Sequence, residues 1–169
     1  KHLVLAIDRA GLVGADGETH QGVFDVSMLR MIPGTVIYSP VTYRQLEADL
    51  AEAVDTESGI CAVRYPKGSQ PALASAVLRE NTDSWFLESR KGSVLLATYG
   101  RLTEELLLAQ QALRNQGCDV DVLVLNRIYP LPTAALEQMK NYQKIFFYEE
   151  GIRSGSIGEL CALQLMEQG

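Results

Sequence analysis

Residues 3–22 read Leu-Val-Leu-Ala-Ile-Asp-Arg-Ala-Gly-Leu-Val-Gly-Ala-Asp-Gly-Glu-Thr-His-Gln-Gly, an apolar run that passes directly into a polar, glycine-rich segment. The run has the character of a buried strand and the segment that of a loop. Similar short runs recur at Val36–Tyr38, Cys61–Arg64, Val94–Thr98, Val120–Leu125 and Ile145–Tyr148. Amphipathic stretches between them predict helices at 24–31, 42–53, 102–116, 133–141 and 156–167. The alternation predicts an α/β fold with two open, mostly parallel sheets and flanking helices.

Two of the predicted helices begin with the pattern of a capping box. Thr42 and Ser156 are each followed three residues later by Gln45 and Glu159, the spacing that satisfies the first free N–H groups of a helix. Gly117 follows the helix predicted at 102–116, as expected of a residue just after a helix end.

The stretch from about residue 68 to residue 92 interrupts the alternation of strands and helices. It contains Pro71, an alanine-rich patch and a mixed polar run, and we interpret residues 71–92 as a linker between domains at 1–70 and 93–169. Trp85 and Phe86 are then anchors that hold the linker to the domains. Three strands in each half are few for a doubly wound sheet, so we expect both domains to be incomplete.

Composition excludes several classes of protein. Hydrophobic residues make up 47% and charged residues 21% of the 169 residues, which is ordinary for a globular chain. The net charge is −6 and no run is rich in Lys or Arg, so nucleic acid is not expected as a partner. No apolar run approaches the roughly 20 residues of a membrane span. Three widely spaced cysteines, at positions 61, 118 and 161, fit neither a disulfide framework nor a metal site, and favour the cytoplasm.

The segment 8–22 is the first candidate for a functional site. It holds four of the fourteen glycines, and it follows a predicted parallel strand, where α/β proteins bind ligands. Glycines let backbone N–H groups turn inward around an anion. The guanidinium of Arg9 suits binding of a phosphate, the carboxylate of Asp16 suits a hydrogen bond from a hydroxyl, and the imidazole of His20 suits proton transfer. The spacing matches neither the dinucleotide fingerprint nor the P-loop. A solvated loop in which His20 bonds only to its neighbours remains the alternative.

Two further segments end predicted strands. Lys67 precedes Gly68 after the third strand, and because parallel strands share one carboxyl edge, Arg9, His20 and Lys67 are expected to converge. An ordinary exposed lysine is the alternative. Residues 149–159 form a glycine-rich helix start, but the adjacent Glu149 and Glu150 favour domain packing over anion binding.

The segment from Asp8 to Gly22, followed by Arg-Tyr-Pro-Lys-Gly at 64–68, resembles the 1-deoxy-D-xylulose-5-phosphate synthases of the thiamine-diphosphate transketolase group. By this resemblance, residues 1–70 correspond to the second half of the pyrimidine-binding domain, and 93–169 to most of the transketolase carboxyl-terminal domain. The family condenses pyruvate with D-glyceraldehyde 3-phosphate, releasing CO2, for isoprenoid, thiamine and pyridoxal synthesis.

The resemblance also implies roles for individual residues. Arg9 and Lys67 match positions that bind the phosphate of the acceptor, and Asp16 and His20 match positions facing its aldehyde and hydroxyl. Position 67 is commonly arginine in the family, so Lys67 gives up a bidentate contact to phosphate.

Other parts of the family's site are not expected in these 169 residues. The diphosphate of the cofactor and its Mg²⁺ are held in the family by an amino-terminal domain, and the activating glutamate lies upstream of the first strand. We therefore expect no tight binding of thiamine diphosphate and no turnover by this chain alone, which is either a fragment or a subunit of a split, homodimeric enzyme. The alternatives are a transketolase, a 2-oxo-acid dehydrogenase β-subunit and a non-catalytic dimerisation module.

Overall fold

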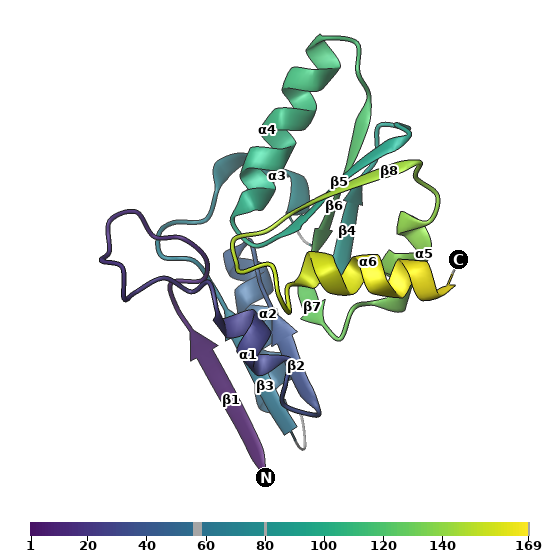
Figure 1. Cartoon of the computed structure of the whole chain (residues 1–169). Helices are drawn as coiled ribbons and strands as arrows, with labels where there is room; N and C mark the ends of the chain where they lie inside the picture. Colours follow the sequence, from purple (N-terminus) through teal and green to yellow (C-terminus); the bar gives the residue numbers. More distant parts are fainter. Residues whose placement is uncertain (56–58, 80, 169) are drawn as a thin grey trace.

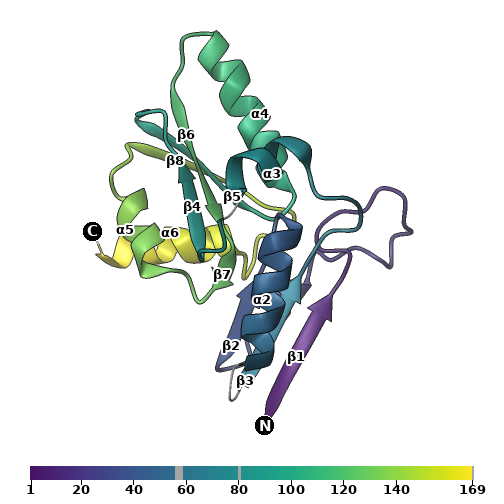
Figure 2. The same ribbon diagram turned by 180° about the vertical axis from the view of Figure 1, so that it is seen from behind.

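The computed structural model describes residues 1–55, 59–79 and 81–168. Residues 56–58 and 169 of the expected domains and residue 80 of the expected linker lie outside the described residues. The described residues form two four-stranded sheets with helices against them (Figures 1 and 2), so the predicted fold class is confirmed.

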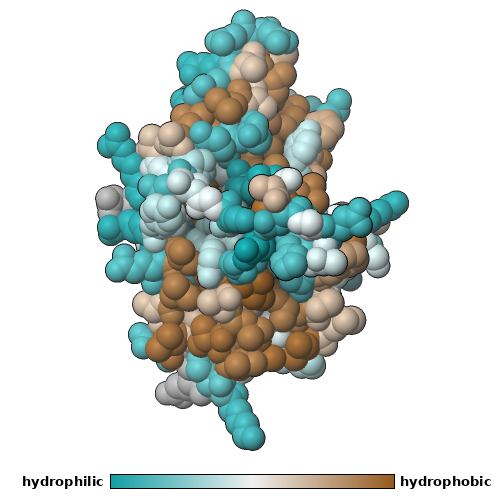
Figure 3. Space-filling model, turned by 90° about the vertical axis from the view of Figure 1, so that its left-hand side faces the viewer, coloured by the Kyte–Doolittle hydropathy of each residue, from teal (hydrophilic) through white to brown (hydrophobic). Residues whose placement is uncertain are grey.

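The first sheet has the strand order β1-β3-β2-β7. Its strands β1 (His2–Ile7), β2 (Thr35–Tyr38) and β3 (Gly59–Arg64) are parallel, as predicted. The helix α2 (Tyr43–Asp55) packs on one face of this sheet, and the short α1 (Asp25–Leu29) packs on the other. β1 is an edge strand, and Figure 3, which views the molecule from this side, shows apolar surface gathered over part of the face.

The second sheet has the order β4-β6-β5-β8. β5 (Val94–Tyr99), β6 (Val120–Leu125) and β8 (Lys144–Tyr148) are parallel, and β4 (Trp85–Glu88) runs antiparallel to β6. Every residue of β6 is buried, as expected of an inner strand covered on both faces. α3 (Ala72–Leu78) and α4 (Leu102–Asn115) cover one face, whereas α5 (Thr133–Met139) and α6 (Ile157–Gln168) pack on the other.

Both predicted capping boxes begin helices in the structure. Thr42 Oγ1 accepts from Gln45 N at 3.2 Å, and Gln45 Oε1 accepts from the backbone N–H groups of Val41 and Thr42. At α6, Ser156 Oγ accepts from Glu159 N at 3.1 Å. The Glu159 side chain bonds to Gly155 N instead of Ser156 N, so this second box is shifted by one residue.

The segment interpreted as a linker contains two regular elements. α3 buries Ala74 and Leu78 against the second sheet, and β4 is the edge strand of that sheet, paired from Trp85↔Leu125 to Glu88↔Val122. Trp85 and Phe86 are thus sheet residues. Because the pairing joins segments nearly forty residues apart, local sequence patterns alone do not reveal it.

The two halves of the chain are joined by a shared sheet and by a shared apolar core. β7 (Arg127–Tyr129) follows the second half's β6, yet it pairs antiparallel with β2 in the first sheet. One apolar core contains Ile37 and Ala62 from the first sheet together with Leu95 and Leu123 from the second. The halves therefore meet over a common interior.

Residues 149–159 provide a second connection, and the domain-packing role predicted for them is confirmed. Arg30 donates to the carbonyls of Gly155 at 2.5 Å and Ser156 at 2.7 Å, and Ser27 Oγ donates to Ser154 O at 3.0 Å. The backbone N–H of Ile152 donates to Val23 O at 3.1 Å.

None of the helices in the described residues is both long and apolar enough to cross a membrane. All three cysteines are free thiols; Cys61 and Cys161 are buried and Cys118 is exposed.

Candidate active site

The loop 8–22 leaves the carboxyl end of β1 and returns to it through a narrow neck. Gly22 N donates to the carbonyls of Arg9 at 3.1 Å and Gly11 at 2.9 Å, and Ala10 N donates to Tyr65 O at 3.0 Å beside β3. Arg9 and Gly11 have φ angles of 57° and 82°, in the left-handed region. A Cβ at position 22 would lie 2.5 Å from Arg9 O, so this neck requires glycine.

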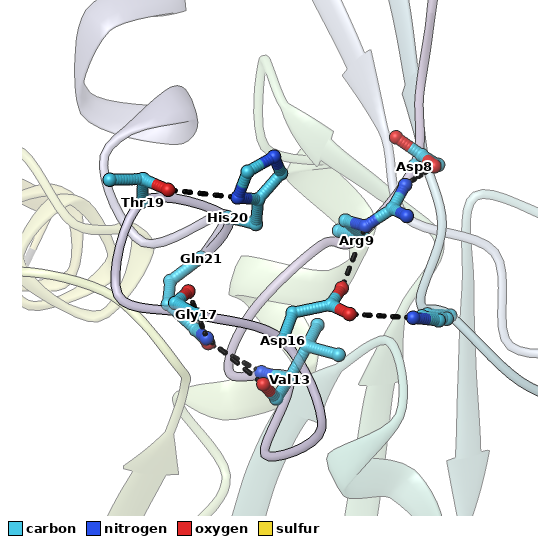
Figure 4. Close-up of polar contacts among 9 residues, drawn as sticks. Asp8, Arg9, Val13, Asp16, Gly17, Thr19, His20 and Gln21 are labelled. Atoms are coloured by element: carbon cyan, nitrogen blue, oxygen red, sulfur yellow. Dashed lines mark hydrogen bonds and ion pairs between the residues drawn. The ribbon is translucent and has the colours of Figure 1, made fainter.

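Gln21 holds the body of the loop in shape (Figure 4). Its Oε1 accepts from Val13 N at 2.5 Å, and its Nε2 donates to Val13 O at 2.9 Å and Gly17 O at 3.3 Å. The loop is thereby closed on itself across eight residues. Gln21 was not among the predicted site residues, because no local pattern marks a side chain that bonds to a distant backbone.

Four charged side chains meet at the mouth of the loop. Asp16 accepts from Arg9 Nε at 2.7 Å and from Lys67 Nζ at 2.6 Å, while Arg9 also contacts Asp8 (Figure 4). The hydrogen bond from Lys67, followed by that from Arg9, lowers the pKa of Asp16, so its carboxylate is ionised near neutral pH. The expected convergence of Arg9 and Lys67 is thus present, with Asp16 between them.

His20 lies to one side of this cluster. Its Nδ1 is 2.9 Å from Thr19 Oγ1, so its bond is to a neighbouring residue. An open hollow of about 170 Å³ is lined by His20 and Arg9, together with Asp8, Thr19, Gln21 and Gly22. The structure therefore places the imidazole beside Arg9 and leaves Lys67 outside that hollow.

Arg64, the last residue of β3, ties the loop to both halves of the chain. It is 2% exposed; its Nε and Nη2 donate to the Asp25 carboxylate at 2.9 and 3.0 Å, and Nη2 also donates to Gly22 O at 3.0 Å. Its guanidinium lies 5.7 Å from the centre of the Tyr99 ring in the second sheet. This role of Arg64 was not predicted, although an arginine that ends an apolar strand is a signal of a paired buried charge.

Tyr99 continues the connection into the second half. Its hydroxyl donates to Glu149 Oε2 at 2.9 Å, and the same carboxylate accepts from Ile157 N at 3.1 Å and Gly158 N at 2.8 Å at the start of α6. Burial, and then the charge of Glu149, raises the pKa of Tyr99. A continuous set of polar contacts therefore runs from Gly22 in the loop to α6.

Arg101 and Glu150 bring charge from the second half to the base of the loop. Arg101 donates to Glu150 through Nε at 2.7 Å and through Nη2. Glu150 packs directly on Gly11, where any Cβ would overlap the carboxylate. Arg101 lines a pocket of about 250 Å³ with Lys67 and Pro66 after β3 and with Ala10, Leu12, Val13, Gly14 and Ala15 of the loop.

The described residues do not assemble a site for a metal ion with a diphosphate. They contain no group of three or more His, Cys, Asp or Glu side chains placed to bind a metal. Asp16 is already bonded to two cations, Arg9 of the loop and Lys67 after β3. These side chains therefore suit an organic anion.

Family models match both halves of the chain. The transketolase pyrimidine-binding domain matches residues 1–71, and the transketolase C-terminal domain matches residues 84–169. The chain belongs to the transketolase family. The second match begins just before β4, consistent with the place of that strand in the second sheet.

Curated relatives of this transketolase-family chain are 1-deoxy-D-xylulose-5-phosphate synthases. The enzyme of Leifsonia xyli is 33% identical over 99% of this chain and 26% of its own length. That of Helicobacter pylori is 36% identical over 97% of the chain and 27% of its own length. The chain thus spans about a quarter of these relatives.

Solved transketolases share the fold. A structure described as a split-gene transketolase, inactive beta4 tetramer, covers 98% of this chain and 53% of its own with a TM-score of 0.82 and 22% identity. A Pichia stipitis transketolase mutant in complex with fructose 6-phosphate has a TM-score of 0.67 over 92% of this chain and 27% of its own, at 15% identity. At these identities the likeness concerns the fold.

Proposed function

We propose that this chain is the carboxyl-terminal part of a 1-deoxy-D-xylulose-5-phosphate synthase, which condenses pyruvate with D-glyceraldehyde 3-phosphate and releases CO2. The observation that carries the proposal is the Arg9–Asp16–Lys67 cluster at the carboxyl ends of β1 and β3. Curated synthases that match nearly the whole chain support the same assignment.

The chain supplies the acceptor side of the reaction. Arg9 and Lys67 bind the acceptor phosphate, since each keeps N–H donors beyond its bond to Asp16. Asp16 holds the two cations together and accepts from an acceptor hydroxyl, and His20 moves a proton at the acceptor aldehyde during carbon–carbon bond formation. The open hollow beside His20 and Arg9 is where the aldehyde end enters.

The rest of the catalytic machinery comes from polypeptide other than the described residues. In the complete enzyme thiamine diphosphate, held with Mg²⁺, supplies the carbanion chemistry. The partner that holds it is the amino-terminal portion of the synthase, as a preceding region or a separate subunit, in a cytoplasmic homodimer. The apolar edge at β1, with Leu3 half exposed, supports such packing, because parallel sheets are normally covered.

A chimera tests the proposal. This chain replaces the carboxyl-terminal quarter of the Helicobacter pylori synthase, and CO2 release from pyruvate is measured with and without D-glyceraldehyde 3-phosphate. We expect release that depends on the acceptor and falls at least roughly 100-fold in His20→Ala. Gel filtration confirms assembly of each variant.

Other outcomes identify the alternatives. Transfer from a ketose phosphate in place of pyruvate indicates a transketolase. An assembled chimera whose turnover is unaffected by His20→Ala and Arg9→Ala indicates a structural module and contradicts the proposal.

The isolated chain gives a separate prediction. Because its described residues provide no metal–diphosphate site, we expect no CO2 release from pyruvate and D-glyceraldehyde 3-phosphate, even with thiamine diphosphate and Mg²⁺ added. Robust release, measured by a coupled CO2 assay, would show that the chain carries the cofactor site itself.

A further inference from the structure

The pocket between Lys67 and Arg101 differs in charge from the rest of the candidate site. Its lining in the described residues holds two cationic side chains and no carboxylate. The hollow beside His20 is lined by Asp8 as well as Arg9. Asp16 and Glu150 pair with Lys67 and Arg101 from outside this lining, so the pocket presents a ligand with the remaining N–H donors of two cations and with no carboxylate among the described residues of its wall.

Arg101 is fixed in place by the second half of the chain. It precedes the first residue of α4, and Glu150 engages Nε and Nη2 of its guanidinium. Glu150 in turn rests on Gly11. The ion pair is therefore braced against the base of the loop, and the orientation of Arg101 is set before any ligand enters.

Both cations retain capacity for an anion. Lys67 uses one of its three N–H groups for Asp16, and Arg101 uses two of its five for Glu150. About half of each side chain is exposed, so a ligand reaches both from solvent. The facing wall, from Val13 to Ala15, includes Gly14, where no atom lies within 4 Å of a Cβ position and the backbone is open.

We propose that Arg101 is a third phosphate-binding residue of the acceptor site, contributed by the second half, and that the pocket it shares with Lys67 receives the phosphomonoester. The inference rests on the proposed function and names where the phosphate lies: the phosphate sits between Lys67 and Arg101, and the carbon chain extends past Asp16 toward His20. Discrimination between phosphorylated and unphosphorylated aldehydes then depends on both halves of the chain.

Calorimetric titration of this chain with glycerol 3-phosphate tests the site without requiring turnover. The ligand carries the phosphomonoester but no aldehyde, and glycerol is the matched control ligand. We expect Arg101→Met to raise the dissociation constant roughly tenfold, through loss of a charge-assisted hydrogen bond. Arg114→Met removes the same charge from the exposed far end of α4 and is expected to change binding less than about twofold.

Glu150→Gln distinguishes phosphate binding by Arg101 itself from a structural effect of the Arg101–Glu150 ion pair. It breaks the charge pairing but keeps Arg101, so we expect binding as tight as in the unchanged chain or tighter. If Glu150→Gln weakens binding as much as Arg101→Met, the pair acts only by bracing the loop and the proposal is overturned. Circular dichroism verifies the fold of each variant.

The remaining outcomes distinguish this inference from the proposed function. Loss of binding in Arg9→Met and Lys67→Met but not in Arg101→Met overturns the role of Arg101 and leaves the acceptor site intact. Loss in Arg101→Met and Lys67→Met but not in Arg9→Met supports the pocket and removes Arg9 from the phosphate contacts. Equal affinity for glycerol and glycerol 3-phosphate, or no binding at about 10 mM ligand, overturns the inference.

Discussion

At the scale of single residues, Asp49 on α2 is a buried acid joined to an amide from the other half of the chain. Asn126 Nδ2 donates to Asp49 Oδ1 at 2.8 Å, whereas Asp49 Oδ2 and Asn126 Oδ1 find no partner among the described residues. One proton on Asp49 lets the acid and the amide form two hydrogen bonds and satisfies both oxygens. Burial, with a contribution from the charge of Glu52, raises the pKa of Asp49 to about 7.

This pairing predicts an unusual pH dependence of stability. Because the folded pKa is about 7 and the ordinary value 3.8, the folded state binds more protons than the unfolded state between those pH values. Stability therefore falls as the pH rises through this window. In Asp49→Asn the amide takes the place of the protonated acid at every pH. We therefore expect the free energy of unfolding of the variant at pH 8, measured with urea, to be higher than that of the unchanged chain by on the order of 3 kcal/mol.

The control for Asp49→Asn lies on the same helix. Asp55 is exposed at the end of α2, and Asp55→Asn removes an equal charge without a buried partner. We expect it to leave the difference in stability between pH 5 and pH 8 unchanged. An equal effect of the two variants would assign the pH dependence to general charge repulsion.

Lys67 gives a prediction about substrate affinity in the complete synthase. An arginine at this position would offer the acceptor phosphate two parallel N–H donors, while Lys67 offers a point charge. We expect Lys67→Arg to lower KM for D-glyceraldehyde 3-phosphate by roughly threefold, with little change in kcat. Unphosphorylated glyceraldehyde is the control substrate, and an equal gain for it would argue against phosphate contact.

At the scale of elements, the neck of the loop is sensitive to a single added methyl group. Gly22→Ala places a Cβ against Arg9 O, and relieving that contact opens the neck that carries His20 and Arg9. We expect a loss of about 1–3 kcal/mol and faster hydrogen exchange across residues 8–22. Gly17→Ala, in the same loop with no atom within 4 Å of the added Cβ, is the control expected to be nearly neutral.

The elements also show how far sequence reasoning reaches. The periodicity of apolar residues and the capping residues were enough to predict α2, α4 and the parallel strands, because those signals are local. β7 consists of three residues whose partner, β2, is nearly ninety residues away, so nothing local announces it. α3 was missed although Leu73 and Val77 lie at helical spacing after Pro71 and the alanines between them favour a helix.

The candidate site was predictable to a similar degree. Shared carboxyl edges of parallel strands were enough to bring Arg9 and Lys67 together. The bond of Asp16 to both cations, and the place of His20 beside Thr19, depend on how the loop folds back through Gln21. Arg101 and Glu150 belong to the second half of the chain. Sequence patterns do not predict how that half is placed against the loop of the first half.

At the scale of the whole molecule, a core that crosses from one sheet to the other predicts a single unfolding transition. Trp85, the one tryptophan, reports on the second sheet, and the buried thiol of Cys61 reports on the first. We expect urea midpoints from Trp85 fluorescence and from thiol labelling of a Cys118→Ser, Cys161→Ala variant to coincide. Midpoints that differ would show that the halves unfold independently.

The crossing of β7 into the first sheet also bears on how such proteins are recombined. The two family models divide the chain between residues 71 and 84, yet a strand of the first sheet is encoded beyond that division, at 127–129. A gene fusion that exchanged the second domain for a distant relative would also exchange one edge of the first sheet and the asparagine that pairs with Asp49. We therefore expect recombination to be productive only where both halves are exchanged together, with the crossover point outside them.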